Sequence, residues 1–302
     1  MSARTVKTFV LLTLPAALLF AAPSASEAQP SASQRSAGCR SSSIDSGRRI
    51  EKTISVAGTE RTFILDVPGN LSPGQAVPLM FDFHGFGHSG AGVWAVSRFH
   101  HLAEEHRFIT VYPTGLPVVL EFSGRKHRAA GWQMAPGKNN RDLAFTRAML
   151  AMIEASYCID RSRIYSTGFS NGAFFSSLLG CEMSETFAAV APVSGGVLRS
   201  GCKPVRPVPI LIQHGTRDEV VPLAMARAGR DQWLSANGCK TTQSGAADGA
   251  RACKVYDSCR AGSVVVYCEE EFAHTWPAQA TDRIWSFFQR TPGGVGRSGD
   301  SR

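Results

Sequence analysis

A serine, an aspartate and a histidine occupy positions where a nucleophile, its acid and its base could be assembled. Ser170 lies between Gly168 and Gly172 in Gly-Phe-Ser-Asn-Gly, directly after a strand-like run and before a helix-like run. A nucleophile on so sharp a turn has a strained backbone and needs small neighbours. The motif predicts a hydroxyl at the carboxyl edge of a sheet, at the positive end of the next helix. The alternative is an ordinary serine N-cap of that helix.

A serine hydroxyl attacks a carbonyl only when a base removes its proton and a third group orients the base. In a strand–turn–helix setting, the acid and then the base are expected later in the chain. Asp218 and His274 each follow a strand-like run, in that order. We therefore predict that Ser170, Asp218 and His274 form a catalytic triad. Glu219 is the alternative acid and His214 the alternative base.

Acyl transfer also needs N–H groups directed at the oxyanion that develops on the substrate. The residue after the serine, Asn171, is expected to supply one backbone N–H. The glycine-rich loop His-Gly-Phe-Gly-His-Ser-Gly follows another strand-like run. It is expected to supply the second N–H, from Phe86, with Gly85 allowing close approach. His84 is expected to pack or to brace this loop.

The rest of the chain alternates between strand-like and helix-like runs. Most strand-like runs are uniformly apolar, as 77–83 is, which is typical of strands covered on both faces. An alternating hairpin precedes them at 52–67. The pattern predicts an α/β fold with a mostly parallel sheet, helices on both faces and an antiparallel hairpin at the N-terminal edge. The stretch 114–140 shows only loop chemistry.

The N-terminus has the layout of a secretory signal peptide, with basic residues, an apolar run and then small residues. The apolar run is too short to span a bilayer comfortably, so we expect a secreted chain without a membrane anchor. We divide the chain into a signal peptide (1–28), a polar leader (29–49), a catalytic domain (50–290) and a disordered tail (291–302).

The chain has 302 residues, 8 cysteines and a formal net charge of +8. Eight cysteines in a secreted chain predict four disulfides. Their spacing does not match a zinc site, and we expect neither metal nor cofactor.

Basic residues are scattered except at Gly124–Arg128, and no nucleic-acid motif appears. The basic cluster is either a solvated surface or a site of attraction for an acidic polysaccharide. We expect a monomer without a nucleic-acid partner.

These segments together resemble the secreted esterases related to feruloyl esterases and polyhydroxybutyrate depolymerases, within the α/β-hydrolase superfamily. The resemblance runs from about Gly38 to Pro277 and is carried by HGFG, GWQ, RDLAFTRAML, YCIDRSRIYSTGFSNGAFFSSLLGCE, HGTRDEVVP and HTWP. It implies an α/β-hydrolase fold with Ser170 as nucleophile, Asp218 as acid and His274 as base.

The resemblance also covers six of the cysteines. It implies the pairs Cys181–Cys202, Cys239–Cys259 and Cys39–Cys158, which leaves Cys253–Cys268 as a fourth pair.

Two stretches depart from the family pattern. The segment before Trp132 is longer than usual, which makes Trp132 and Phe122 candidate walls for an aromatic acyl group. The alternative for Trp132 is an anchor of this loop. Glu269–Glu271 stand where the family often has glycines. If these carboxylates face the imidazole of His274, they would favour its charged form.

The sequence therefore predicts a secreted serine esterase that forms an acyl-enzyme. The resemblance implies feruloyl-type or acetyl esters of plant polysaccharide, with the ester free or attached to the polymer. A polyhydroxybutyrate oligomer depolymerase is the alternative in the same family. A serine peptidase and a non-catalytic binding protein are alternatives from other functional classes.

Overall fold

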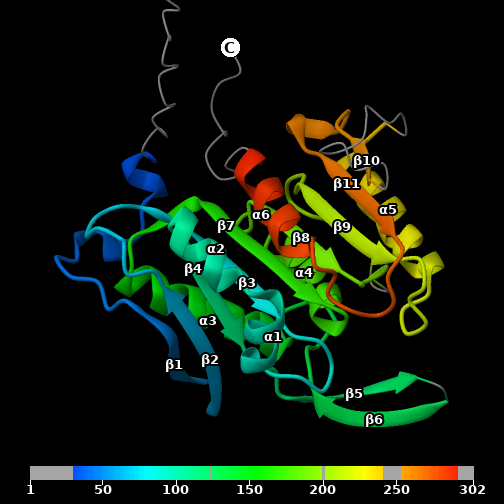
Figure 1. Cartoon of the computed structure of the whole chain (residues 1–302), viewed down its shortest axis with the longest axis horizontal. Helices are drawn as coiled ribbons and strands as arrows, with labels where there is room; N and C mark the ends of the chain where they lie inside the picture. Colours follow the sequence, from blue (N-terminus) through cyan, green and yellow to red (C-terminus); the bar gives the residue numbers. More distant parts are fainter. Residues whose placement is uncertain (1–29, 123, 199–200, 241–252, 292–302) are drawn as a thin grey trace, which may run out of the picture.

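The computed structural model describes residues 30–122, 124–198, 201–240 and 253–291. Its centre is a sheet of nine described strands (Figure 1). Across the sheet they run in the order β1 (Gly47–Val56), β2 (Thr59–Val67), β4 (Ile109–Pro113), β3 (Val77–Phe83), β7 (Ile159–Phe169), β8 (Ala189–Val193), β9 (Ile210–Gly215), β11 (Val265–Glu270) and β10 (Cys253–Tyr256). The strands from β4 to β11 are parallel, whereas β1, β2 and β10 pair antiparallel at the two edges.

Helices cover both faces of this sheet. One face packs against α3 (Arg141–Ser156), α4 (Asn171–Glu182) and α5 (Leu223–Asn237). The other packs against α1 (Gly90–Ser97), α2 (Phe99–His106) and α6 (Ala280–Arg290). Short 3-10 turns complete the described elements at Ala32–Gln34, Ala37–Arg40 and Arg260–Gly262. The predicted α/β architecture, with its hairpin at the N-terminal edge, is confirmed.

The segment 114–140 is not loop throughout, and that expectation is wrong. It contains β5 (Pro117–Phe122) and β6 (Arg125–Ala130), an antiparallel hairpin that extends beyond the body at the lower right of Figure 1. These two strands pair only with each other among the described elements. Because β6 carries polar and small residues and lies largely in solvent, it has no apolar alternation to reveal it.

The edge strand β10 was also missed by the sequence reading. It has four residues and pairs with β11 in register, so that Cys253 lies opposite Cys268. A strand this short carries too little periodicity to be recognised from sequence.

The segment interpreted as a polar leader, 29–49, is packed against the domain where it is described, and its last residues begin β1. The Ser36 hydroxyl donates to the carbonyl of Tyr157 at 2.6 Å and accepts from the N–H of Ile159 at 2.8 Å. Gly38 lies so close that an added Cβ would be 2.3 Å from the Tyr157 carbonyl oxygen. The signal peptide and all of the tail except Thr291 lie outside the described residues.

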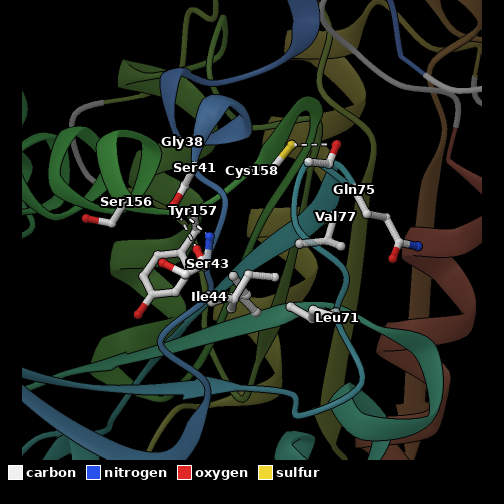
Figure 2. A pocket seen from close by; sticks show the side chains of 12 residues that line it. Gly38, Ser41, Ser43, Ile44, Leu71, Gln75, Val77, Ser156, Tyr157 and Cys158 are labelled. Atoms are coloured by element: carbon white, nitrogen blue, oxygen red, sulfur yellow. Dashed lines mark hydrogen bonds between the residues drawn. The ribbon is translucent and has the colours of Figure 1, made fainter.

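Figure 2 shows the small cavity beside this docked segment, which is lined by Tyr157, Val77 and Cys158 among others. Its volume is about 10 Å³, which is at most enough for one water molecule. It lies next to the first residue of β3 and just before β7, whereas Ser170 follows the other end of β7. This cavity is therefore too small and too remote to receive the substrate of a reaction at Ser170.

Four disulfides connect the described cysteines, and their pairing is the one expected. They join Cys39 to Cys158, Cys181 to Cys202, Cys239 to Cys259 and Cys253 to Cys268. A search of the described helices found none with the length and apolar character needed to cross a bilayer.

A buried ion pair ties the N-terminal hairpin to helix α3. The Arg61 guanidinium on β2 donates to the Asp142 carboxylate at 2.7 Å, and both side chains are almost inaccessible to solvent. The second carboxylate oxygen of Asp142 accepts from the N–H of Gln133 at 2.9 Å. The pair therefore holds together β2, α3 and the segment that returns from the β5–β6 hairpin.

We expect Arg61→Ala to destabilise the fold by about 3 kcal/mol, because it leaves a buried carboxylate without its cation. Urea unfolding followed by circular dichroism measures the change. Arg161→Ala is the matched control, since it breaks an ion pair with Glu154 in which the Arg161 side chain is 42% exposed. That control should lower the free energy of unfolding by less than about 1 kcal/mol. Equal losses in the two variants would contradict the role given to the buried pair.

Candidate active site

The structure brings Ser170, His274 and Asp218 into one hydrogen-bonded chain. His274 Nε2 lies 2.9 Å from Ser170 Oγ, and His274 Nδ1 lies 2.8 Å from Asp218 Oδ2. Because the carboxylate accepts, Nδ1 carries a proton and the Nε2 lone pair faces the hydroxyl. The His274 side chain is 17% exposed, so the chain of groups is reachable from solvent.

Ser170 sits on a backbone turn that its two flanking glycines permit. Its φ and ψ are 54° and −118°, a conformation that side-chain-bearing residues rarely adopt. An added Cβ on Gly172 would lie 2.0 Å from the Phe83 carbonyl oxygen, and one on Gly168 would lie 2.7 Å from the same atom. The Ser170 side chain makes no N-cap hydrogen bond. Its hydroxyl is directed instead to the His274 ring, as the motif predicts.

Asp218 is held by the loop that follows β9. Its Oδ1 accepts from the N–H groups of Val221 at 2.8 Å and Val220 at 3.0 Å, which leaves Oδ2 for His274. Burial alone would raise the pKa of this carboxyl. The hydrogen bonds from His274, Val221 and Val220 outweigh that effect, so the Asp218 pKa lies below its ordinary value. The carboxylate is therefore ionised when it faces the imidazole.

The alternative base, His214, and the alternative acid, Glu219, do not belong to the hydrogen-bonded chain. His214 is fully buried, and its Nε2 lies 2.9 Å from the Val221 carbonyl, to which it donates. Burial lowers the pKa of His214, which favours a neutral ring that supports the Asp218 loop. Glu219 is exposed at the surface. Neither replaces His274 or Asp218 in the hydrogen-bonded chain.

The two residues expected to form an oxyanion hole, Asn171 and Phe86, lie in segments next to Ser170. Asn171 is the first residue of α4, so its N–H has no acceptor within the helix. In the loop after β3, the N–H of Gly87 donates to Ala130 at 2.8 Å and that of His88 to Gly85 at 3.2 Å. Phe86 lies between Gly85 and Gly87 in this loop. An added Cβ on Gly85 would be 3.5 Å from Ser170 Cβ, so this loop lies against the serine.

The Asn171 side chain has a function that the sequence did not reveal. Its Oδ1 accepts from the N–H of Trp132 at 2.7 Å, and its Nδ2 donates to the Trp132 carbonyl at 3.2 Å. This pair of bonds fixes the end of the β5–β6 hairpin segment to the start of α4. Asn171 therefore couples the hairpin to the residue that carries the hydroxyl.

Of the two roles considered for Trp132, its position fits the loop anchor and not the wall of an open cleft. Its side chain is 1% exposed and packs edge-on against Phe83 and in a stack on Phe175. The indole Nε1 donates to the His84 carbonyl at 2.8 Å. Trp132 is thus a core anchor, since both its ring and its N–H are satisfied inside the protein. Phe122 ends β5, and its side chain lies outside the described part of the structure.

The glutamates before His274 are held by arginines. Glu269 forms two hydrogen bonds with Arg227, at 2.7 and 2.8 Å, which lower its pKa to about 2. Glu270 bonds Arg283 at 2.6 and 2.9 Å. The carboxylate that bonds the imidazole of His274 is Asp218. The expected influence of Glu269–Glu271 on the imidazole therefore finds no support in this geometry.

Phe169 is a contact residue of the site that the sequence analysis did not single out. Its ring centroid lies 4.7 Å from that of His274. On its other side, an added Cβ on Gly85 would be 3.1 Å from Phe169 Cδ1. The ring therefore contacts the base and also lies close to the loop after β3. The signal was its place directly before Ser170.

In the part of the chain that the structure describes, no cluster of three or more His, Cys, Asp or Glu side chains is arranged to hold a metal ion. The groups assembled here are a hydroxyl, an imidazole, a carboxylate and backbone N–H groups. This set has the geometry for nucleophilic attack on a carbonyl carbon.

Comparison with known sequences places this arrangement in a family. Feruloyl esterase D of Neurospora crassa is 30% identical over an alignment of 308 positions, which covers 94% of this chain and 96% of the relative. Feruloyl esterase B of Piromyces equi is 28% identical over 69% of this chain, and the match spans 41% of that longer protein. No family model matches the chain.

Solved structures with a similar fold are known. An acetyl xylan esterase from Aspergillus awamori superposes with a TM-score of 0.62 at 18% identity, over 80% of this chain and 99% of that one. A ferulic acid esterase from Anaeromyces mucronatus superposes with a TM-score of 0.52 at 18% identity, over 85% of this chain and 96% of that one. These likenesses identify the α/β-hydrolase fold. With the full-length match to the Neurospora protein, they lead to one conclusion: the chain belongs to the feruloyl esterase family and is a carboxylic ester hydrolase.

Proposed function

We propose that this chain hydrolyses feruloyl-type or acetyl esters of plant polysaccharide through an acyl-enzyme on Ser170. The observation that carries the proposal is the continuous hydrogen-bonded chain from Asp218 through His274 to Ser170. The names of the relatives, feruloyl esterase D and feruloyl esterase B, support the choice of substrate.

In the first half-reaction, His274 Nε2 takes the proton of the Ser170 hydroxyl while Oγ bonds to the ester carbonyl carbon. The imidazolium is stabilised by the ionised Asp218 carboxylate. The carbonyl oxygen becomes an oxyanion that accepts from the N–H groups of Asn171 and Phe86. The imidazolium then gives its proton to the leaving alkoxide, and the carbon–oxygen bond of the ester breaks.

In the second half-reaction, water attacks the acyl-enzyme. His274 removes a proton from the water as its oxygen bonds to the acyl carbon. Collapse of the second oxyanion returns the proton to Ser170 Oγ and releases the carboxylic acid. The positive end of α4 lies at the same point and favours the negative charge in both steps.

We also propose that the chain acts outside the cell as a monomer, free of nucleic acid and of a membrane anchor. The four disulfides support an oxidising compartment. A secretory signal peptide at 1–28 would deliver it there.

The β5–β6 hairpin is the element proposed to meet a polymeric substrate. Its base lies against the site, since an added Cβ on Gly131 would be 2.7 Å from Asn171 Oδ1 and 3.3 Å from the Phe86 ring. Along one face, Val119 lies opposite Arg128 and Glu121 opposite Lys126. Both basic side chains are exposed, so this face suits a polysaccharide that carries uronate groups.

We expect Ser170→Ala to lower kcat by about 10⁴-fold or more, because no other hydroxyl can form the acyl-enzyme. Initial rates on methyl ferulate, together with labelling by a fluorophosphonate, measure the effect. Glu219→Gln is the control, since that exposed residue lies outside the triad. Fluorophosphonate labelling that persists in Ser170→Ala would show that another residue is the nucleophile.

The substrate is tested by a panel of methyl ferulate, acetylated xylan, 3-hydroxybutyrate oligomers and a chromogenic peptide. We expect kcat/KM to be highest for methyl ferulate or acetylated xylan and lost in Ser170→Ala. A preference for the hydroxybutyrate oligomers would assign the chain to the polyester alternative instead. Cleavage of the peptide at a comparable rate would assign it to the peptidases.

For the hairpin, we expect Lys126→Ala/Arg128→Ala to raise KM for a feruloylated uronate-bearing oligosaccharide by about three- to tenfold at low salt. KM for methyl ferulate should stay unchanged, and added salt should remove the difference. Arg48→Ala/Lys254→Ala removes the same charge from exposed positions on β1 and β10. If this control raises KM as much, the effect belongs to net charge and not to the hairpin.

A further inference from the structure

The buried histidine at the start of the oxyanion loop makes two hydrogen bonds that the reaction scheme does not use. His84 directly follows β3 and its side chain is fully buried. Its Nε2 lies 2.9 Å from the backbone nitrogen of Gly115, and its Nδ1 lies 2.7 Å from the carbonyl oxygen of Gly85. The ring also packs against the Trp132 indole, with centroids 4.9 Å apart.

These two partners determine the tautomer of the ring. The N–H of Gly115 can only donate, so Nε2 of His84 must accept and carries no proton. The carbonyl of Gly85 can only accept, so Nδ1 must carry the proton. Burial lowers the pKa of His84 to about 4, which agrees with a neutral ring.

The Nδ1–H bond acts on the peptide unit that contains the proposed oxyanion donor. Gly85 C=O and Phe86 N–H belong to the same peptide, and the described backbone contains no cis bond. In a trans peptide these two groups point in opposite directions. A donor that holds the Gly85 oxygen on the ring side therefore directs the Phe86 N–H to the opposite side.

We propose that His84 is a positioning residue: through Nδ1–H it fixes the Gly85–Phe86 peptide so that the Phe86 N–H faces the substrate oxyanion. This inference rests on the proposed esterase function and concerns the second donor of its oxyanion hole. The same Gly85 oxygen also accepts from the His88 N–H at 3.2 Å, so donors from two directions hold it. Polarisation of the carbonyl by two donors also makes the Phe86 N–H a stronger donor.

The interaction affects the transition state more than substrate binding. An oxyanion donor contributes when it is already oriented at the moment charge develops. A peptide released from His84 would have to reorient during each catalytic cycle. The loss is therefore expected in kcat, with KM little changed.

Two substitutions test the two hydrogen bonds of the His84 side chain one at a time. His84→Asn places an amide N–H near the position of Nδ1, which keeps the donor to Gly85 and loses the acceptor for Gly115. His84→Gln places an amide oxygen near the position of Nε2, which keeps the acceptor for Gly115 and loses the donor to Gly85. The two variants are matched controls for each other, because each retains one of the two bonds.

We expect His84→Gln to lower kcat on methyl ferulate by about 10²-fold, with an equal rise in Ki for a trifluoromethyl ketone that forms a tetrahedral adduct with the serine. His84→Asn should keep kcat within about tenfold of wild type. Thermal unfolding of both variants shows that each is folded at the assay temperature. Equal losses of kcat in the two variants, or no loss in His84→Gln, would overturn the proposal and leave His84 as a structural brace.

A measurement on the wild-type protein gives a second test that does not depend on variants folding. Nitrogen-15 NMR of labelled histidine reports which ring nitrogen carries the proton. We expect Nδ1–H for His84, and an Nε2–H tautomer would overturn the proposal. Failure of the esterase function is distinguishable, because a wild-type protein that neither hydrolyses esters nor reacts with a fluorophosphonate fails independently of His84.

Discussion

The site depends on one close approach of backbone to backbone. Helix α4 begins so near the end of β3 that an added Cβ on Gly172 would be 2.0 Å from the Phe83 carbonyl oxygen. This contact forces the chain to turn within one residue, and Ser170 takes the strained conformation with φ of 54°. The strain persists because the parallel sheet and the packed helix leave the turn no alternative. The same contact brings the loop after β3 beside Ser170. The Ser170 hydroxyl and the loop expected to supply an oxyanion donor therefore lie next to each other.

The parallel order of the sheet explains how distant residues meet. Ser170, Asp218 and His274 follow β7, β9 and β11, whose carboxyl ends lie at one edge with β8 between the first two. The sheet therefore fixes the distances between the three loops that carry the triad. Each loop then needs only to hold one side chain in place. Asp218 is fixed by two N–H groups of its own loop. His274 is held between that carboxylate and the Phe169 ring.

The sequence predicted the parts of the molecule that have local signals. Apolar runs marked most of the parallel strands, and the triad followed because each member lies in the turn or loop after a strand. The β5–β6 hairpin escaped because β6 consists of polar and small residues, so the apolar run of β5 had no recognisable partner strand beside it. The role of Trp132 stayed open because a ring in a polar loop can point either outward or into the core, and only tertiary contacts such as that with Phe175 decide. The pairing of Glu269 with Arg227 depends on contacts 42 residues apart and was equally beyond sequence reasoning.

The β5–β6 hairpin is attached to the rest of the domain at its base. Its ends are fastened at Gly115, by a bond to His84, and at Trp132, by bonds to Asn171. Between these two attachment points its strands pair only with each other. At the base of the hairpin the Ala130 carbonyl accepts from the Gly87 N–H, and Gly131 lies against Asn171. Residues 118–129, beyond these contacts, can therefore change in length and charge without disturbing the packed core. Divergence within such a family can alter this part of the hairpin while the residues that carry out ester cleavage stay in place.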